Sequence, residues 1–144
     1  MNTTELKLVI DTNILISIIG KISAHRWIFD AIISERISLC ITNEILLEYR
    51  EILERKTTVT IAENVIELIL LLPTTIQTVT HFNFQLIDLD KEDNKFIDCA
   101  VASNAHFLVS NDNHFNILKT IEFPVVSLLT LQEFEDLYKS ALTK

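Results

Sequence analysis

Aspartates follow two short apolar segments of the chain that are typical of buried strands. Asp11 stands directly after residues 6–10, and Asp112 stands shortly after residues 106–109. In open α/β sheets, ligands bind at the edge formed by the carboxyl ends of the strands. If the two strands are parallel neighbours, the two carboxylates meet there, and that is costly unless a proton or a cation lies between them. The pattern therefore predicts a site for a hard metal ion.

Glu48 is a third candidate for this site. Thr42 can cap the helix that follows it, and the apolar stripe of this helix consists of Ile45, Leu46, Tyr49, Ile52 and Leu53. Glu48 lies about 40° from Ile52 around the helix, at the edge of that stripe. This position allows the carboxylate to point along the sheet edge, and it equally allows a glutamate that is solvated at the rim of the core.

Asp93 lies one turn before the buried face of a later helix, which is formed by Phe96, Ile97, Ala100 and Val101. Its side chain should project toward the middle of that face. Two interpretations remain open: Asp93 caps the helix, or it is a ligand at the sheet edge. Asp98 falls on the flank of the same helix, where we expect it to be solvated, although it could reach the rim of the site.

Shorter polar residues accompany the strand-end acids. Asn13 and Ser110 could orient carboxylates or hold water on a metal, or they could simply bond to loop amides. His114 is close to Asp112 in sequence, but a single histidine there is more often a surface residue than a ligand. Asp88 and Asp90 precede the later helix, and turn formation explains them adequately.

The elements that must position these residues alternate along the chain. We expect strands at residues 6–10, 38–41, 76–80, 106–109 and 125–127, and helices at about 14–19, 24–34, 43–56, 60–72, 94–104 and from 130. Capping boxes at 60–63 and 130–133 should open two of the helices; Pro73 should end the first of these, and Gly20 should end the helix at 14–19. The alternation predicts an α/β fold with a parallel sheet of about five short strands between helices.

Composition bounds the class of protein. The chain has 144 residues, 49% of them hydrophobic and 22% charged, which predicts a single globular domain over residues 1–144. No apolar stretch is long enough to cross a membrane, and residues 1–5 do not resemble a signal peptide. Cys40 and Cys99 have no metal-binding or redox spacing. We therefore expect a cytoplasmic protein with buried thiols and no membrane partner.

The single glycine, Gly20, excludes several kinds of chemistry. Glycine-rich phosphate loops, dinucleotide fingerprints and nucleophile elbows all need more than one. The net charge of −8 argues against a nucleic-acid partner. If four carboxylates are assigned to a metal cluster, the net charge of the remaining residues is still mildly negative, so the chain does not offer a basic face.

Four motifs together resemble a PIN domain. They are VIDTN at 9–13, TNEILLE at 42–48, DKEDNKF at 90–96 and LVSND at 108–112. They occur in the family's order and span most of the chain. The nearest subgroup consists of bacterial PIN proteins often labelled as toxins of toxin–antitoxin pairs.

This resemblance implies a three-layer α/β/α sandwich and a metal-dependent ribonuclease whose quartet of acids is Asp11, Glu48, Asp93 and Asp112. Asn13 matches an asparagine of the family, and Asp98 matches a position where the subgroup often has an acid. Ser110 stands where the family usually has threonine, and the hydroxyl is kept. Asn111 replaces a frequent glycine, so that turn must either change conformation or place asparagine at positive φ.

The resulting hypothesis is hydrolysis of phosphodiester bonds in single-stranded RNA. Ligands rich in oxygen and poor in histidine favour Mg²⁺ or Mn²⁺ over zinc, and the metal would activate water. Lys91, Lys95 and Arg50 could contact the RNA backbone, although charged residues near helix ends are usually just solvated. The resemblance also implies an antitoxin partner and a homodimer.

Two alternatives belong to other classes. Receiver and phosphatase-like α/β proteins also place aspartates at strand ends. However, Asn13 stands where such a phosphatase needs a second aspartate, and Thr12 does not supply the paired acids of a receiver. The other alternative is a PIN-like fold that binds RNA or a protein partner without catalysis. The complete acid quartet argues against it, whereas the acidic composition favours it.

Overall fold

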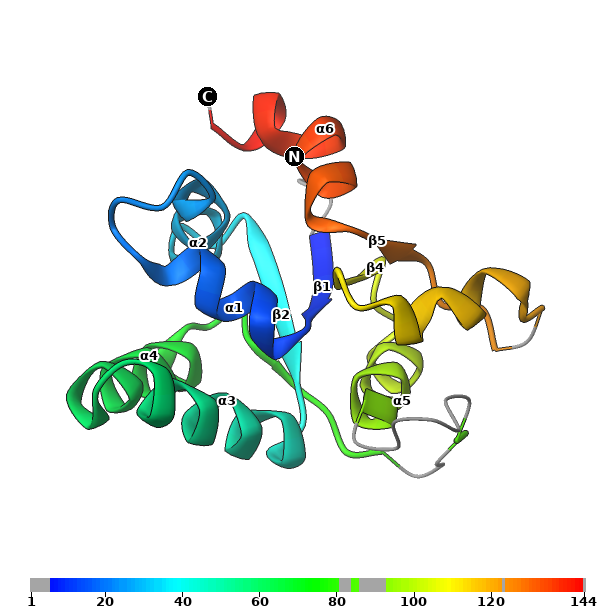
Figure 1. Ribbon diagram of the computed structural model, residues 1–144, viewed down its shortest axis with the longest axis horizontal. Helices are drawn as coiled ribbons and strands as arrows, with labels where there is room; N and C mark the ends of the chain where they lie inside the picture. The colour runs from blue at the N-terminus through cyan, green and yellow to red at the C-terminus, as the bar shows by residue number, and fades with distance from the viewer. Residues whose placement is uncertain (1–5, 81–83, 86–92, 123, 144) are drawn as a thin grey trace.

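The fold is built on a parallel sheet of five strands. The computed structural model describes residues 6–80, 84–85, 93–122 and 124–143 (Figure 1). The strands are β1 (Leu6–Ile10), β2 (Ile37–Ile41), β3 (Ile76–Gln77), β4 (Phe107–Val109) and β5 (Leu128–Leu129). Their order is β3-β2-β1-β4-β5, and every neighbouring pair is parallel. The parallel sheet expected from the sequence is therefore confirmed.

Helices cover both sides of the sheet. They are α1 (Thr12–Ile19), α2 (Arg26–Ile33), α3 (Asn43–Lys56), α4 (Val59–Leu71), α5 (Asn94–Ser103) and α6 (Leu131–Leu142), with a 3₁₀ helix, η2, at Asn113–Thr120. Helix α2 packs on β2 and α6, whereas α5 packs on β1, β2 and β4. In Figure 1, α1 and α2 lie on one side of the central strands and α5 lies on the other. The expected α/β/α architecture is confirmed.

The core lies between the sheet and these helices. Leu8, Val9 and Ile10 of β1 are fully buried, and all five residues of β2 are buried, as expected for strands covered on both faces. Tyr49 is also fully buried, and its hydroxyl donates a hydrogen bond to the carbonyl of Ile10. This bond fixes the end of β1, immediately before Asp11. No helix among the described residues combines the length and apolarity needed to cross a membrane.

Helix capping follows the sequence at two of the three expected sites. The hydroxyl of Thr42 accepts a hydrogen bond from the amide of Ile45, and Thr130 forms a complete capping box with Glu133. The expected capping box at 60–63 is wrong. Helix α4 begins at Val59, and Thr58 is its N-cap, with its hydroxyl 3.1 Å from the amide of Ile61. Helix α3 ends at Lys56, so only Thr57 and Thr58 connect it to α4, and Thr58 is the residue directly before the first turn.

The last strand is also displaced from its expected position. Residues 125–127 are not a strand; Leu128 and Leu129 pair with Leu108 and Val109 instead. Val125 is 74% exposed, so its β-branched side chain does not contribute to the sheet. The segment 113–120, for which the sequence predicted no element, forms the 3₁₀ helix η2.

Smaller differences concern the ends of elements. Strand β3 spans two residues instead of 76–80, and α2 begins at Arg26. Gly20 ends α1 with a φ of −68°, so its freedom to adopt positive φ is not used. Asp88, Asp90 and Lys91, considered above, lie outside the described residues.

Candidate metal centre

The two strand-end aspartates lie at the same edge of the sheet. Strands β1 and β4 are parallel neighbours, with Ile10 beside Val109, and the amide of Asp11 donates to the carbonyl of Val109 at 3.0 Å. Asp11 and Asp112 line one cleft of about 410 Å³ together with Asn13. The sheet topology thus brings together the residues that the strand-end argument selected.

Ser110 links these two acids. Its hydroxyl donates to Oδ2 of Asp11 at 2.7 Å and accepts from the amide of Asp112 at 3.0 Å. Ser110 is 1% exposed, so water does not compete for these bonds. Asn111 is not among the described residues with positive φ. The turn therefore takes another conformation, in which Oδ1 of Asn111 accepts from the amide of Leu131 at the start of α6.

Asp11 is poised to bind a cation. The side chain stands at the N-cap position of α1 but makes no capping hydrogen bond, and the residue is 6% exposed. Burial raises the pKa of Asp11, and the charges of Asp112 and Glu48 raise it further, against smaller opposing effects of hydrogen bonds from Ser110 and Thr12. A carboxylate that is destabilised by desolvation and by like charges is stabilised by a nearby cation.

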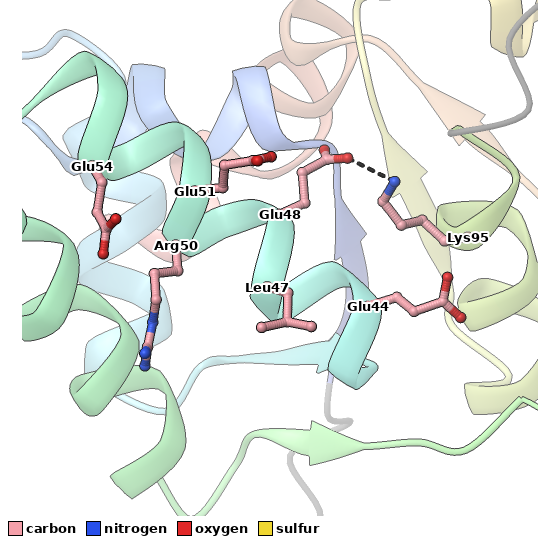
Figure 2. A pocket seen from close by; sticks show the side chains of 7 residues that line it. All are labelled: Glu44, Leu47, Glu48, Arg50, Glu51, Glu54 and Lys95. Carbon is pink, nitrogen blue, oxygen red and sulfur yellow. Dashed lines mark ion pairs between the residues drawn. The ribbon is translucent and has the colours of Figure 1, made fainter.

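Glu48 reaches this region from α3. Its Oε2 accepts a hydrogen bond from the hydroxyl of Thr12, the residue after Asp11, and its Oε1 lies 2.6 Å from Nζ of Lys95. Figure 2 shows Glu48 extending toward Lys95, whereas Arg50 points away from this pair. The interpretation of Glu48 as a glutamate solvated at the rim of the core does not hold, because both carboxylate oxygens have protein partners.

Lys95 and Arg50, the candidate RNA contacts, differ in their surroundings. The Lys95 side chain is 10% exposed and partly neutralises Glu48. Arg50 is exposed and lines a groove along α3 with four glutamates and Leu47 (Figure 2). Lys95 therefore belongs to the acid site, whereas Arg50 lies on the surface beside it.

Asp93 approaches the site from the start of α5. It occupies the N-cap position of that helix, but its side chain makes no capping hydrogen bond. The capping interpretation therefore fails, and Oδ2 of Asp93 instead lies 3.5 Å from Nδ1 of His114. The same nitrogen lies 3.5 Å from Oδ1 of Asp112. One ligand atom from each of these three residues can be chosen so that all lie within 4.8 Å of one another.

His114 is exposed, as expected for a surface residue, and the structure also places it between two acids. Its side chain is 41% exposed, so it stands at the open side of the cluster. The Asp112 carboxylate accepts a hydrogen bond from the backbone amide of His114 at 2.9 Å, and this bond begins η2. The sequence offered one signal for His114 as part of the site, namely its position two residues after Asp112. This spacing becomes informative only together with the tertiary contact between His114 and Asp93.

Asp98 has a different role from the one expected. It is 5% exposed, not solvated, and its Oδ1 accepts from the amide of Phe84 at 3.0 Å. Burial raises the pKa of Asp98; the bond from Phe84 opposes this and the charge of Glu44 adds to it. Asp98 therefore links the backbone of Phe84 to α5.

These donors suit a divalent cation. Three carboxylates, an imidazole and a supporting hydroxyl form an oxygen-rich set with one nitrogen, which is compatible with Mg²⁺ and more so with Mn²⁺. The clustered ligand atoms of Asp93, Asp112 and His114 provide the geometric basis for this fit. Ser110 ties Asp11 to that cluster, and Thr12 ties Glu48 to Asp11.

Replacing Ser110 by alanine should weaken the site without unfolding the protein. The change removes the bond that orients Asp11, and loss of such supporting groups typically costs about 10–100-fold in metal affinity or activity. Calorimetric titration with Mn²⁺ would measure the effect. Ser110→Thr keeps the hydroxyl and serves as the matched control, so an equal loss in both variants would contradict the assigned role.

The fold and the cluster of acids at the carboxyl edge of a parallel sheet define a class of α/β proteins with a candidate metal-binding cleft. Residues 7–114 match the model of the PIN domain family, and the chain belongs to that family. No curated protein matches the sequence.

Two solved structures show the same fold. The first is VapBC2 from Rickettsia felis bound to a DNA fragment from its promoter, with a TM-score of 0.60 and 17% identity over 87% of this chain and 98% of that chain. The second is DNA-bound VapBC from Salmonella typhimurium, with a TM-score of 0.54 and 17% identity, covering 87% of this chain and 98% of that chain.

Proposed function

We propose that this protein is a metal-dependent endoribonuclease that hydrolyses phosphodiester bonds of single-stranded RNA. The observation that carries the proposal is the grouping of Asp93, Asp112 and His114, with Ser110 joining Asp112 to Asp11 at the carboxyl edge of the sheet. Membership of the PIN domain family supports a nuclease role. A cluster of carboxylates that is unfavourable by itself and open to a cleft suits metal-assisted hydrolysis better than it suits a structural role.

In this proposal Asp11, Glu48, Asp93 and Asp112 hold Mg²⁺ or Mn²⁺. The metal would activate water and offset the negative charge of the scissile phosphate. The chain's own groups prepare the site for it. Ser110 keeps the Asp11 carboxylate oriented, and Lys95 limits the negative charge at Glu48. Asn13 lines the cleft and is a candidate for orienting the substrate.

We also propose that the protein acts as the toxin of a toxin–antitoxin pair, with an antitoxin protein as its partner. Support comes from the shared fold with chains of the VapBC complexes and from the resemblance to the toxin subgroup. A homodimer is part of the same proposal.

Metal removal is the direct test of the ribonuclease. Purified protein should cleave single-stranded RNA in Mn²⁺ or Mg²⁺, and EDTA should abolish cleavage, because in this proposal the metal activates the attacking water. Product lengths on a denaturing gel measure the reaction. Cleavage that persists in EDTA would contradict the proposal.

The second candidate is a PIN-like module that binds RNA or a protein partner without catalysis. The net charge of −8 favours the protein-binding form of this module over an RNA enzyme, because an acidic surface repels a polyanion. RNA binding measured separately from cleavage distinguishes the two. Binding without metal-dependent cutting, in folded protein free of a partner, would favour the module.

A further inference from the structure

His25 lines the same cleft as Asp11 and Asp112, although it comes from the connection before α2. Its side chain is 32% exposed. His25 occupies the N-cap position of α2, where serine, threonine, aspartate and asparagine are preferred, and it makes no capping hydrogen bond with its side chain. Helix capping therefore does not explain a histidine at this position.

Helix α6 holds the His25 ring. Nδ1 lies 2.7 Å from Oε2 of Glu135, and Nε1 of Trp27 donates to the same oxygen at 3.0 Å. Trp27 in turn stacks on Phe134, with ring centroids 5.8 Å apart and planes 4° from parallel. The ring of His25 is thus fixed by a carboxylate that is itself fixed by an aromatic pair.

Glu135 is kept ionised in this arrangement. Burial alone would raise its pKa, but hydrogen bonds from Trp27 and His25, together with the positive charges of His25 and Lys139, lower it below the usual value. With Nδ1–H donated to this carboxylate, the nitrogen that remains for a ligand is Nε2. Among the described residues, Nε2 makes no hydrogen bond.

The charges of the residues that line the cleft indicate which kind of ligand Nε2 of His25 can bind. Asp11 and Asp112 are acidic, and His25 is the one side chain among the cleft-lining residues that can carry a positive charge. A bound metal would neutralise the acids that hold it. The phosphates next to the scissile one would still face the negative charge of the rest of the protein. A fixed imidazole in the same cleft can donate a charge-assisted hydrogen bond to such a phosphate.

We propose that His25 binds a non-bridging phosphate oxygen of RNA in this cleft and that Glu135 positions its ring. The proposal rests on the proposed function and names a substrate contact for the same site. Glu135 lies outside the residues 7–114 that match the family model, so the positioning group comes from the C-terminal helix of this chain.

The test measures binding of fluorescently labelled single-stranded RNA of mixed sequence by anisotropy in EDTA, across a salt series. Cleavage of the same RNA in Mn²⁺ is followed in parallel. His25→Gln should weaken binding about tenfold, since it removes one charge-assisted bond. It should also reduce the slope of log affinity against log salt by about 0.7, as expected for one single-strand phosphate contact.

Further variants separate a phosphate contact from a structural brace. His25→Arg retains a cationic donor and should restore binding and the salt slope. Glu135→Gln should weaken binding less than His25→Gln, because the ring remains but is no longer fixed. Arg55→Gln, an exposed cation on α3 that does not line the cleft, is the matched control for a lost charge. Thermal melting confirms that each variant is folded.

The outcomes distinguish this proposal from the ribonuclease proposal. Binding that depends on His25, without cleavage by the wild type, supports the contact and contradicts the enzyme. Cleavage with binding and salt slope unchanged in His25→Gln overturns the contact and leaves the enzyme standing. Absence of RNA binding overturns the contact, and absence of cleavage in Mn²⁺ as well overturns both.

Discussion

Asp11→Asn is expected to lower metal-dependent cleavage of RNA by on the order of a thousandfold, since a metal-held charge contributes several kcal/mol to such a reaction. Asparagine keeps the size of the side chain and can still accept the bond from Ser110, but it removes the charge that attracts the cation. Initial rates of RNA cleavage in Mn²⁺ would measure the loss. Asp136→Asn, an exposed acid on α6, is the matched control and should keep full activity. Activity retained in Asp11→Asn would contradict the assignment.

The same substitution should change how stability depends on pH. Burial raises the pKa of Asp11, so the folded protein holds this proton more tightly than the unfolded chain does. The stabilising effect of that proton is therefore present below the unfolded pKa of about 3.9 and is lost as the pH rises through the higher folded pKa.

Asparagine has no proton to lose. In metal-free buffer, Asp11→Asn should therefore gain stability relative to the wild type as the pH is raised from about 4 to about 7. Urea unfolding of both proteins at each pH measures this difference. A difference that does not change between the two pH values would show that Asp11 is not destabilised by its surroundings.

Phe115→Ala is expected to lower the free energy of unfolding by about 3–5 kcal/mol, the usual cost of deleting a buried aromatic ring. Phe115 and Phe96 are both fully buried and pack edge to face with ring centroids 6.4 Å apart. Phe115 follows His114 in η2, and Phe96 lies near the start of α5, after Asp93. The ring pair therefore holds together the two segments that supply the ligand cluster.

Metal binding should weaken together with stability in this variant. Urea unfolding and calorimetric titration with Mn²⁺ measure the two effects. Phe29→Ala is the matched control, because Phe29 is buried in α2 and does not join the ligand segments. It should lose comparable stability but keep the Mn²⁺ affinity of the folded protein. Equal loss of affinity in both variants would mean that general loosening, not the ring pair, accounts for the effect.

Predictions that depended on neighbours along the chain succeeded most often. The alternation of apolar strands and helices predicted the parallel sheet, and a hydroxyl three residues before an amide predicted the caps at Thr42 and Thr130. The same rule failed at 60–63, because the N-cap of α4 is Thr58. Local sequence patterns also could not decide whether residues 125–127 or the residues after them join the sheet, because that depends on the register against β4.

The residues of the candidate site were likewise predicted only in part. Strand ends and helix faces pointed to Asp11, Glu48, Asp93 and Asp112, since periodicity determines which face of an element a residue occupies. Periodicity does not determine the partner. It placed Asp98 in solvent, whereas the structure buries it against the amide of Phe84. It treated His114 as a surface residue; His114 is exposed, but periodicity did not reveal that its Nδ1 lies 3.5 Å from Asp93.

The sequence by itself determined the fold class, the order of the elements and the acids at the carboxyl edge of the sheet, because these follow from local patterns of apolar and polar residues. Only the tertiary structure decided that Ser110 bonds Asp11 across 99 residues and that Glu135 holds His25 across 110. Such contacts depend on how the helices pack and on strand register, and neither is encoded in the spacing of the residues that finally meet.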